Sequence, residues 1–337
     1  MRQTTLLKVF AALAVFGPAA SAADSQLMSM VMPDAKILAG VNAGSTRISP
    51  FGQFIIAKVA TLGVGPQKFI AATGFDPLRD VSEVLAASNA DPSRPGGLLL
   101  VRGNFNVDKI VAAATANLPN VQVQSYNGAT LLSGTNPKTN TIQALAFIGD
   151  SIAIFSDQAA VEAALDRNGA SSGAPVAIDP ALAAQVNQLS SKEDEWLVSS
   201  VSVASLVPPN VAPSSGPAAQ TLPILKNIQS FSGGVSFAAN IQMTGQAQLS
   251  DVQNATALAA VLKLGVTFVS AMGGNNAQLK DLTQLLQAID VTTSGSAVNV
   301  SLAIPETQVE ALLNQVLKPP TPAARARLRS HRLPNGN

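Results

Sequence analysis

The chain contains no cysteine among its 337 residues. This absence excludes disulfide bonds, cysteine nucleophiles, thiolate metal sites and a lipid-modified N-terminal cysteine. There is a single histidine, His331, which lies among arginines near the C-terminus. A catalytic base must be held within hydrogen-bond reach of its nucleophile, so Ser-His-Asp catalysis and histidine metal sites are not expected. The sequence therefore predicts no catalytic residue, no metal ligand and no cofactor.

Charged and aromatic residues are also scarce, at 12% and 4% of the chain. A formal net charge of +1 provides no long-range field that would attract nucleic acid, so nucleic-acid binding is not expected. The low aromatic content leaves no stacking surface of the kind that carbohydrate-binding clefts use. In contrast, 47% of the residues are hydrophobic, and the length is sufficient for two cores.

Residues 1–22 have the pattern of a secretory signal peptide. Arg2 and Lys8 precede an apolar run from Val9 to Phe16, and Ala20-Ser21-Ala22 offers the small residues that a signal peptidase reads. The run is shorter than the roughly 20 residues that span a bilayer. We expect cleavage after Ala22 and a secreted or periplasmic bacterial protein that has no transmembrane segment after cleavage.

The stretch from Leu249 to Leu317 predicts a long helix, a shorter helix, a strand pair and a closing helix. Ser250-Asp251-Val252-Gln253 has the form of a capping box, with Ser250 as the cap. The helix that follows is expected to be largely buried along a 3.6-residue stripe, and a second stripe continues to the next helix. The two stripes comprise Leu258, Leu262, Gly265, Val269 and Met272, then Leu279, Leu282, Leu285, Leu286 and Ile289. Ser294-Gly295-Ser296 is expected to turn the strand pair.

The N-terminal part alternates strand and helix patterns. Val81 to Ala87 favours a strand, and Leu98 to Val101 is a continuous apolar run typical of a central strand. Asn127-Gly128 is the dipeptide best suited to a tight hairpin turn, and Gly149-Asp150 predicts a second hairpin.

A similar order of elements recurs in the C-terminal part. Each series ends in a related helix, Ser156 to Leu165 in the first and Pro305 to Leu313 in the second, which indicates an internal repeat.

These patterns predict an α+β fold of two related halves, each an antiparallel-rich sheet with helices packed on one face. Ser171 to Pro175 marks the boundary. The expected organisation is a signal peptide at 1–22, an N-terminal domain at 23–173 and a C-terminal domain at 174–317 that contains a proline-rich loop at 207–223. A disordered basic tail at 318–337 carries Arg325, Arg327, Arg329 and Arg332.

Three pieces of the N-terminal half occur together in a known group of proteins. They are Gly74-Phe75-Asp76-Pro77-Leu78-Arg79-Asp80-Val81, then Val101-Arg102-Gly103-Asn104-Phe105, and then Tyr126-Asn127-Gly128 with Ala163-Ala164-Leu165-Asp166-Arg167. From about Met32 to Gly169 the chain thus resembles uncharacterised exported proteins of acidobacteria and related soil bacteria. The resemblance implies export and a strand-helix architecture, and it assigns no site residue.

Several acidic residues are candidates for a chemical role. Lys192-Glu193-Asp194-Glu195-Trp196 is interpreted as a solvated loop before a strand, because successive carboxylates there point to opposite sides and do not converge. Trp196 is expected to fill the core. Asp76 is interpreted as a helix cap, and Arg79 with Asp80 as a surface pair.

The leading functional hypothesis is a non-enzymatic exported protein that binds an envelope protein or polymer through exposed strand edges or the proline-rich loop. The alternative is a carrier or binder of an apolar ligand such as a lipid, held between the helices and the sheet. The third is a hydrolase that uses carboxylates alone, with Glu83, Asp108, Asp150 and Asp157 as candidates.

Overall fold

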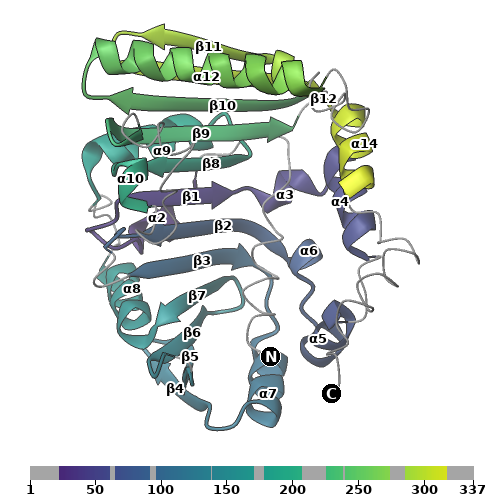
Figure 1. Ribbon diagram of the computed structural model, residues 1–337. Coiled ribbons are helices and arrows are strands. Elements are labelled where there is room, and N and C mark those ends of the chain that lie inside the picture. Colours follow the sequence, from purple (N-terminus) through teal and green to yellow (C-terminus); the bar gives the residue numbers. More distant parts are fainter. Residues whose placement is uncertain are drawn as a thin grey trace, which may run out of the picture.

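The computed structural model describes residues 23–60, 65–91, 96–137, 139–170, 178–206, 225–237, 240–273 and 285–316. Their strands form one twelve-stranded sheet in the order β11-β12-β10-β9-β8-β1-β2-β3-β7-β6-β5-β4, and every neighbouring pair is antiparallel (Figure 1). The predicted signal peptide, the proline-rich loop, the basic tail and most of the second helix predicted in the C-terminal stretch lie outside the described residues.

The strands are β1 (Ile37–Val41), β2 (Val81–Ser88), β3 (Gly97–Gly103), β4 (Gln122–Tyr126), β5 (Ala129–Thr135), β6 (Ile142–Ile148), β7 (Ile152–Asp157), β8 (Glu195–Ser199), β9 (Ile228–Phe237), β10 (Asn240–Leu249), β11 (Ile289–Ser294) and β12 (Ala297–Pro305). The helices are α2 (Ser25–Ser29), α3 (Ala43–Thr46), α4 (Pro50–Ala60), α5 (Gly65–Thr73), α6 (Pro77–Asp80), α7 (Val107–Asn117), α8 (Gln158–Ala170), α9 (Pro180–Ser190), α10 (Val203–Leu206), α12 (Val252–Gly273) and α14 (Glu306–Val316).

The α+β class is confirmed, but a separate sheet for each half is not. Strand β1 lies between β2 and β8 and pairs with both, so it joins strands from the two predicted halves into one sheet. Local sequence patterns specify a strand and its faces but not its distant neighbour, which is why two smaller sheets were expected.

Helices cover both faces of the sheet, rather than the single face that was expected. Side chains that oppose each other across neighbouring strands share a face, so the strand registers allow each face to be followed along the sheet. On face A, α2, α8 and α9 pack over a core that includes Leu38, Leu85, Leu100, Leu131, Ile154 and Val198. On face B, α7 packs over a second cluster that includes Val101, Leu132, Phe147 and Ala153.

Face B continues into the C-terminal strands. There α12 packs on Val291, Val298 and Leu249, while α4 and α14 pack around Phe237 and Ile241. The same strands present a polar row on face A, including the exposed Thr244, Gln246 and Ser301. An antiparallel sheet tolerates one solvated face, and the described residues form a core layer on face B alone at this end of the sheet.

The predicted hairpins are confirmed. Asn127 and Gly128 both have positive φ, 49° and 80°, which is the backbone of a type I′ turn between β4 and β5. Gly295 has a φ of 57° at the turn between β11 and β12. The preference for a strand at Val81 to Ala87 is also correct, since these residues belong to β2.

The long C-terminal helix differs from its prediction in two ways. Asp251, not Ser250, caps α12, because its Oδ1 accepts the N–H of Asn254 at 2.8 Å. Over its described side chains, 252–267, the helix is not largely buried: Leu262 is 36% exposed and Leu264 is 68% exposed. None of the described helices is long and apolar enough to cross a membrane. Ile289 begins β11 instead of ending a helix.

Candidate functional site

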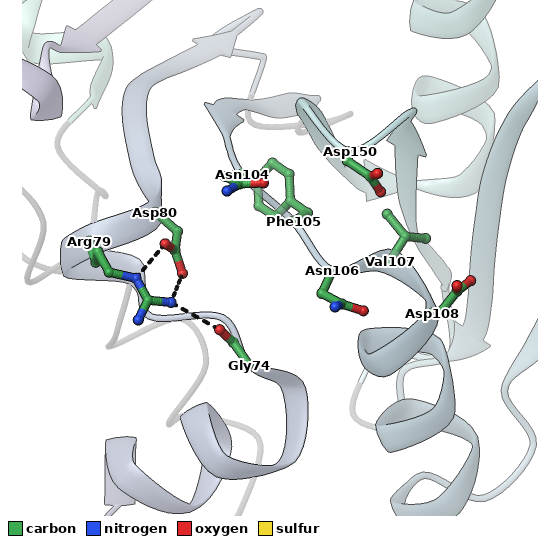
Figure 2. A pocket seen from close by; sticks show the side chains of 9 residues that line it. All are labelled: Gly74, Arg79, Asp80, Asn104, Phe105, Asn106, Val107, Asp108 and Asp150. Atoms are coloured by element: carbon green, nitrogen blue, oxygen red, sulfur yellow. Dashed lines mark hydrogen bonds and ion pairs between the residues drawn. The ribbon is translucent and has the colours of Figure 1, made fainter.

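A polar pocket lies between α6 and the start of α7, and its cavity volume is about 420 Å³ (Figure 2). The segment that links β3 to α7 and the turn between β6 and β7 complete it. Its lining residues are Gly74, Arg79, Asp80, Asn104, Phe105, Asn106, Val107, Asp108 and Asp150. The pocket therefore brings together two pieces of the sequence that carry the resemblance, Gly74 to Val81 and Val101 to Phe105.

The charged residues on the α6 side of the pocket are held by local bonds. Asp76 caps α6, since its Oδ1 accepts the N–H of Leu78 at 3.0 Å, as the sequence predicts. The carboxylate of Asp80 accepts the N–H of Asp76 at 2.8 Å and hydrogen bonds from Arg79 at 2.7 Å. Burial acts to raise the pKa of Asp80, but these hydrogen bonds hold it below its ordinary value. Only Arg79 is a surface residue of this pair, because the Asp80 side chain is 10% exposed.

A backbone hydrogen bond and a stacked pair of aromatic rings hold the opposite wall of the pocket. The N–H of Asn104 donates to the carbonyl oxygen of Asp80 at 2.8 Å, and the ring of Phe105 stacks on Phe75 with centroids 5.1 Å apart. A Cβ on Gly103 would lie 2.6 Å from that same Asp80 oxygen. This close approach requires glycine at position 103. Gly103 and Phe105, two residues of the motif, therefore have a structural explanation.

The four acidic residues proposed for hydrolysis do not converge. Asp108 and Asp150 line the pocket and are both exposed, and Asp108 lies in the first turn of α7 (Figure 2). Asp157 instead caps α8 through the N–H of Ala160 at 3.0 Å. Glu83 is on face A of β2, across from Arg102.

Glu83 belongs to a cluster that the sequence analysis missed. Its Oε1 accepts the N–H of Asp24 at 2.9 Å, while the Asp24 carboxylate binds Arg102, with Nη2 to Oδ2 at 2.7 Å. Burial raises the pKa of Glu83 to about 7, against the backbone hydrogen bond and the charge of Arg102, and the charge of Asp24 raises it further. The signal was present, since Glu83 shares the two-residue period of Leu85 and therefore faces the core.

Glu193 and Asp194 are buried, so the solvated loop predicted for them is wrong. They are 8% and 1% exposed. The Glu193 Oε1 accepts the hydroxyl of Thr244 at 2.9 Å, whereas Asp194 Oδ2 accepts the N–H of Phe237 at 2.9 Å. The two carboxylates serve different strands, which agrees with the expectation that they do not converge. Trp196 is 6% exposed and fills the core as predicted.

The third piece of the resemblance is also joined by contacts. Asp166 Oδ1 accepts hydrogen bonds from the Tyr126 hydroxyl at 3.1 Å and from the Asn127 side chain at 2.7 Å. Arg167 donates to the carbonyl oxygen of Met30 at 2.8 Å. These bonds connect α8 to the β4–β5 hairpin and to the end of α2.

Within the described residues, no group of three or more histidine, cysteine, aspartate or glutamate side chains could hold a metal ion. The pocket lining offers carboxylate and amide side chains and the guanidinium of Arg79. The buried acids Glu193 and Asp194 accept hydrogen bonds from Thr244 and Phe237.

The chain matches no protein-family model and no curated protein. Its fold is similar to solved structures of TP0453. Crystal forms I and III share 10% identity with it, at TM-scores of 0.44 and 0.45, and cover 88% of this chain and 99% and 100% of theirs. Crystal form IV shares 7% identity at a TM-score of 0.45, over 85% of this chain and 95% of its own.

Proposed function

We propose that this is a non-enzymatic exported protein that binds an envelope protein through the outer surface of α12. The observation that carries the proposal is the exposure of large apolar side chains on this helix: Val252 is 59% exposed, Leu262 36% and Leu264 68%. Of the three, Leu264 lies on the side of α12 away from its buried stripe, and large apolar side chains exposed in this way occur on interaction surfaces.

The position of α12 supports a docking role. Its buried stripe of Ala255, Leu258 and Ala259 anchors the first half of the helix to the sheet. The next residue of that stripe, Leu262, is 36% exposed, so the stripe is less buried at this point of the helix. A rigidly anchored helix that presents Leu264 outward offers a preformed surface to a partner groove.

The charge on α12 favours a protein partner over a lipid surface. Helices that lie in a membrane interface carry many lysines and arginines on their polar face. Lys263 is the only charged residue between Val252 and Gly273. The outward positions near Leu264 are instead small and uncharged, among them Ala257 and Ala260, which suits close packing against another helix.

The test compares Leu264→Gln with a matched control at the far end of the sheet, Ile142→Gln, since Ile142 is 51% exposed. Purified protein is incubated with envelope extract, crosslinked and analysed by mass spectrometry. The expected result is one recurrent partner that the wild type and the control recover and Leu264→Gln does not. Equal recovery by the wild type and both variants, or recovery of no partner, would refute the proposal.

The second candidate function is the binding of an apolar ligand such as a lipid, and the same exposed side chains favour it. A flotation assay with neutral phosphatidylcholine vesicles distinguishes the two. Flotation of the wild type that is lost in Leu264→Gln, without a protein partner, would support the lipid ligand.

Hydrolysis by carboxylates alone is the third candidate, and its support is the presence of Asp108 and Asp150 in one pocket. This hypothesis requires a substrate that the wild type hydrolyses. Hydrolysis of that substrate should be lost in Asp108→Asn and also in Asp150→Asn. Because both side chains are exposed, these variants should fold as the wild type does.

A further inference from the structure

Strand β4 is an edge strand without the usual protection against pairing. It lies at the end of the sheet opposite β11 and α12, and among the described strands it pairs with β5 alone (Figure 1). Natural edges are commonly blunted by charged residues, proline or a β-bulge. The β4 sequence Gln-Val-Gln-Ser-Tyr has no charge and no proline, its register with β5 is regular, and four of its five residues are exposed.

The hairpin geometry determines which backbone groups face outward. In a two-residue type I′ hairpin, the residues that flank the turn form a hydrogen-bonded pair, and hydrogen-bonded pairs then alternate along the strands. The flanking pair here is Tyr126 with Ala129. Tyr126, Gln124 and Gln122 therefore bond to β5, while the N–H and C=O groups of Val123 and Ser125 point away from the sheet.

We propose that β4 is the site of self-association, where a second copy of this chain adds its own β4 in antiparallel orientation with the twofold axis at Gln124. Val123 of each copy then opposes Ser125 of the other, and each pair exchanges its outward N–H and C=O groups. This register uses all the outward backbone groups of the strand. The two sheets become one continuous sheet, with face A of one copy beside face A of the other.

The side chains agree with a second copy as the occupant. Side chains alternate between faces, so Gln124 lies beside its own symmetry mate on face A, and a primary amide both donates and accepts. Val123 meets the small Ser125 on face B. No charged side chain opposes a like charge, which is the usual barrier to self-pairing of an edge. This surface is at the other end of the sheet from α12, so the proposal is independent of the proposed function.

The first test is a proline placed where the N–H points outward. Ser125→Pro removes an outward donor and leaves the bonds to β5 intact, so the monomer should retain its fold. Thr293→Pro makes the same change at an outward position of the other edge strand, β11, and is the matched control. In sedimentation equilibrium, the wild type and Thr293→Pro are expected to be dimers. Ser125→Pro is expected to dissociate more than about tenfold more readily.

The second test remains informative even if the proline variant fails to fold. Gln124→Lys and Gln124→Glu each place like charges across the twofold axis, so each should be monomeric alone at low salt. Their equimolar mixture should form a heterodimer. A monomeric wild type, a dimer that survives Ser125→Pro, or a mixture that stays monomeric would overturn the proposal.

Discussion

Replacement of Glu83 by glutamine should change how stability depends on pH. Burial and the nearby Asp24 carboxylate raise the pKa of Glu83 to about 7, from an ordinary value of 4.5. Between these two values the unfolded chain has lost the proton and the folded chain has kept it. The folded state then binds more protons than the unfolded state, so the free energy of unfolding falls as the pH rises.

The magnitude follows from the size of this shift. At 1.36 kcal/mol for each pH unit, the contribution of Glu83 amounts to a loss of about 3 kcal/mol between pH 4.5 and 7, with little further change above pH 7. Glutamine retains an oxygen that can accept the N–H of Asp24 and has no proton to lose. Glu83→Gln should therefore be close to the wild type at pH 4.5 and up to about 3 kcal/mol more stable than it at pH 8.

The assay is urea unfolding of both proteins at intervals from pH 4.5 to 8. The dependence of the unfolding free energy on urea concentration should be the same for both, which shows that they unfold in the same transition. A second variant tests the cause. Asp24→Asn keeps a residue that can cap α2 but removes the charge that faces Glu83, so the decline with pH should become shallower. Parallel curves for the wild type and Glu83→Gln across this range would refute the reasoning.

Three further substitutions test the packing of the sheet, each by the free energy of unfolding. Gly40→Ala should destabilise the protein by at least about 3 kcal/mol and alter the fluorescence of the lone tryptophan, because the new Cβ would lie 2.3 Å from the ring of Trp196. Gly103→Ala should cost about 2 kcal/mol, since its Cβ would meet a backbone carbonyl oxygen of α6 at 2.6 Å. Asp194→Ala should cost about 2 kcal/mol, as it removes a buried acceptor for the N–H of Phe237.

Local elements could be predicted because their causes are local. Asn127-Gly128 supplies two residues that tolerate positive φ, and the alternation of Leu85 and Ala87 with less buried residues places both in the core, so the hairpin and the strand follow from neighbouring residues. The position of β1 between β2 and β8 has no such cause. It depends on which distant strand edges meet, and the sequence pattern of β1 would be the same beside other partners.

The candidate acids show a different limit. A dense run of charge predicts a solvated loop, because charged residues are seldom buried without partners. Asp194 is buried because it receives the backbone N–H of Phe237 and, at 3.3 Å, the hydroxyl of Ser45. Those donors are 43 and 149 residues away in sequence. The composition of the loop alone could not indicate that they would be there.

Several residues of the sequence motifs noted in the N-terminal half have an identity that the fold explains. Asp80 accepts hydrogen bonds from Asp76, at the start of α6, and from Arg79. Gly103 allows the backbone to pass close to the carbonyl oxygen of Asp80, and Asp166 accepts a hydrogen bond from Tyr126. Proteins that share these residues would share the junctions they build, whatever they bind. A property particular to this chain is therefore to be sought where the fold imposes no such requirement. The outward positions of β4 and the outer surface of α12 are such places, because uncharged and apolar side chains there contribute little to the core.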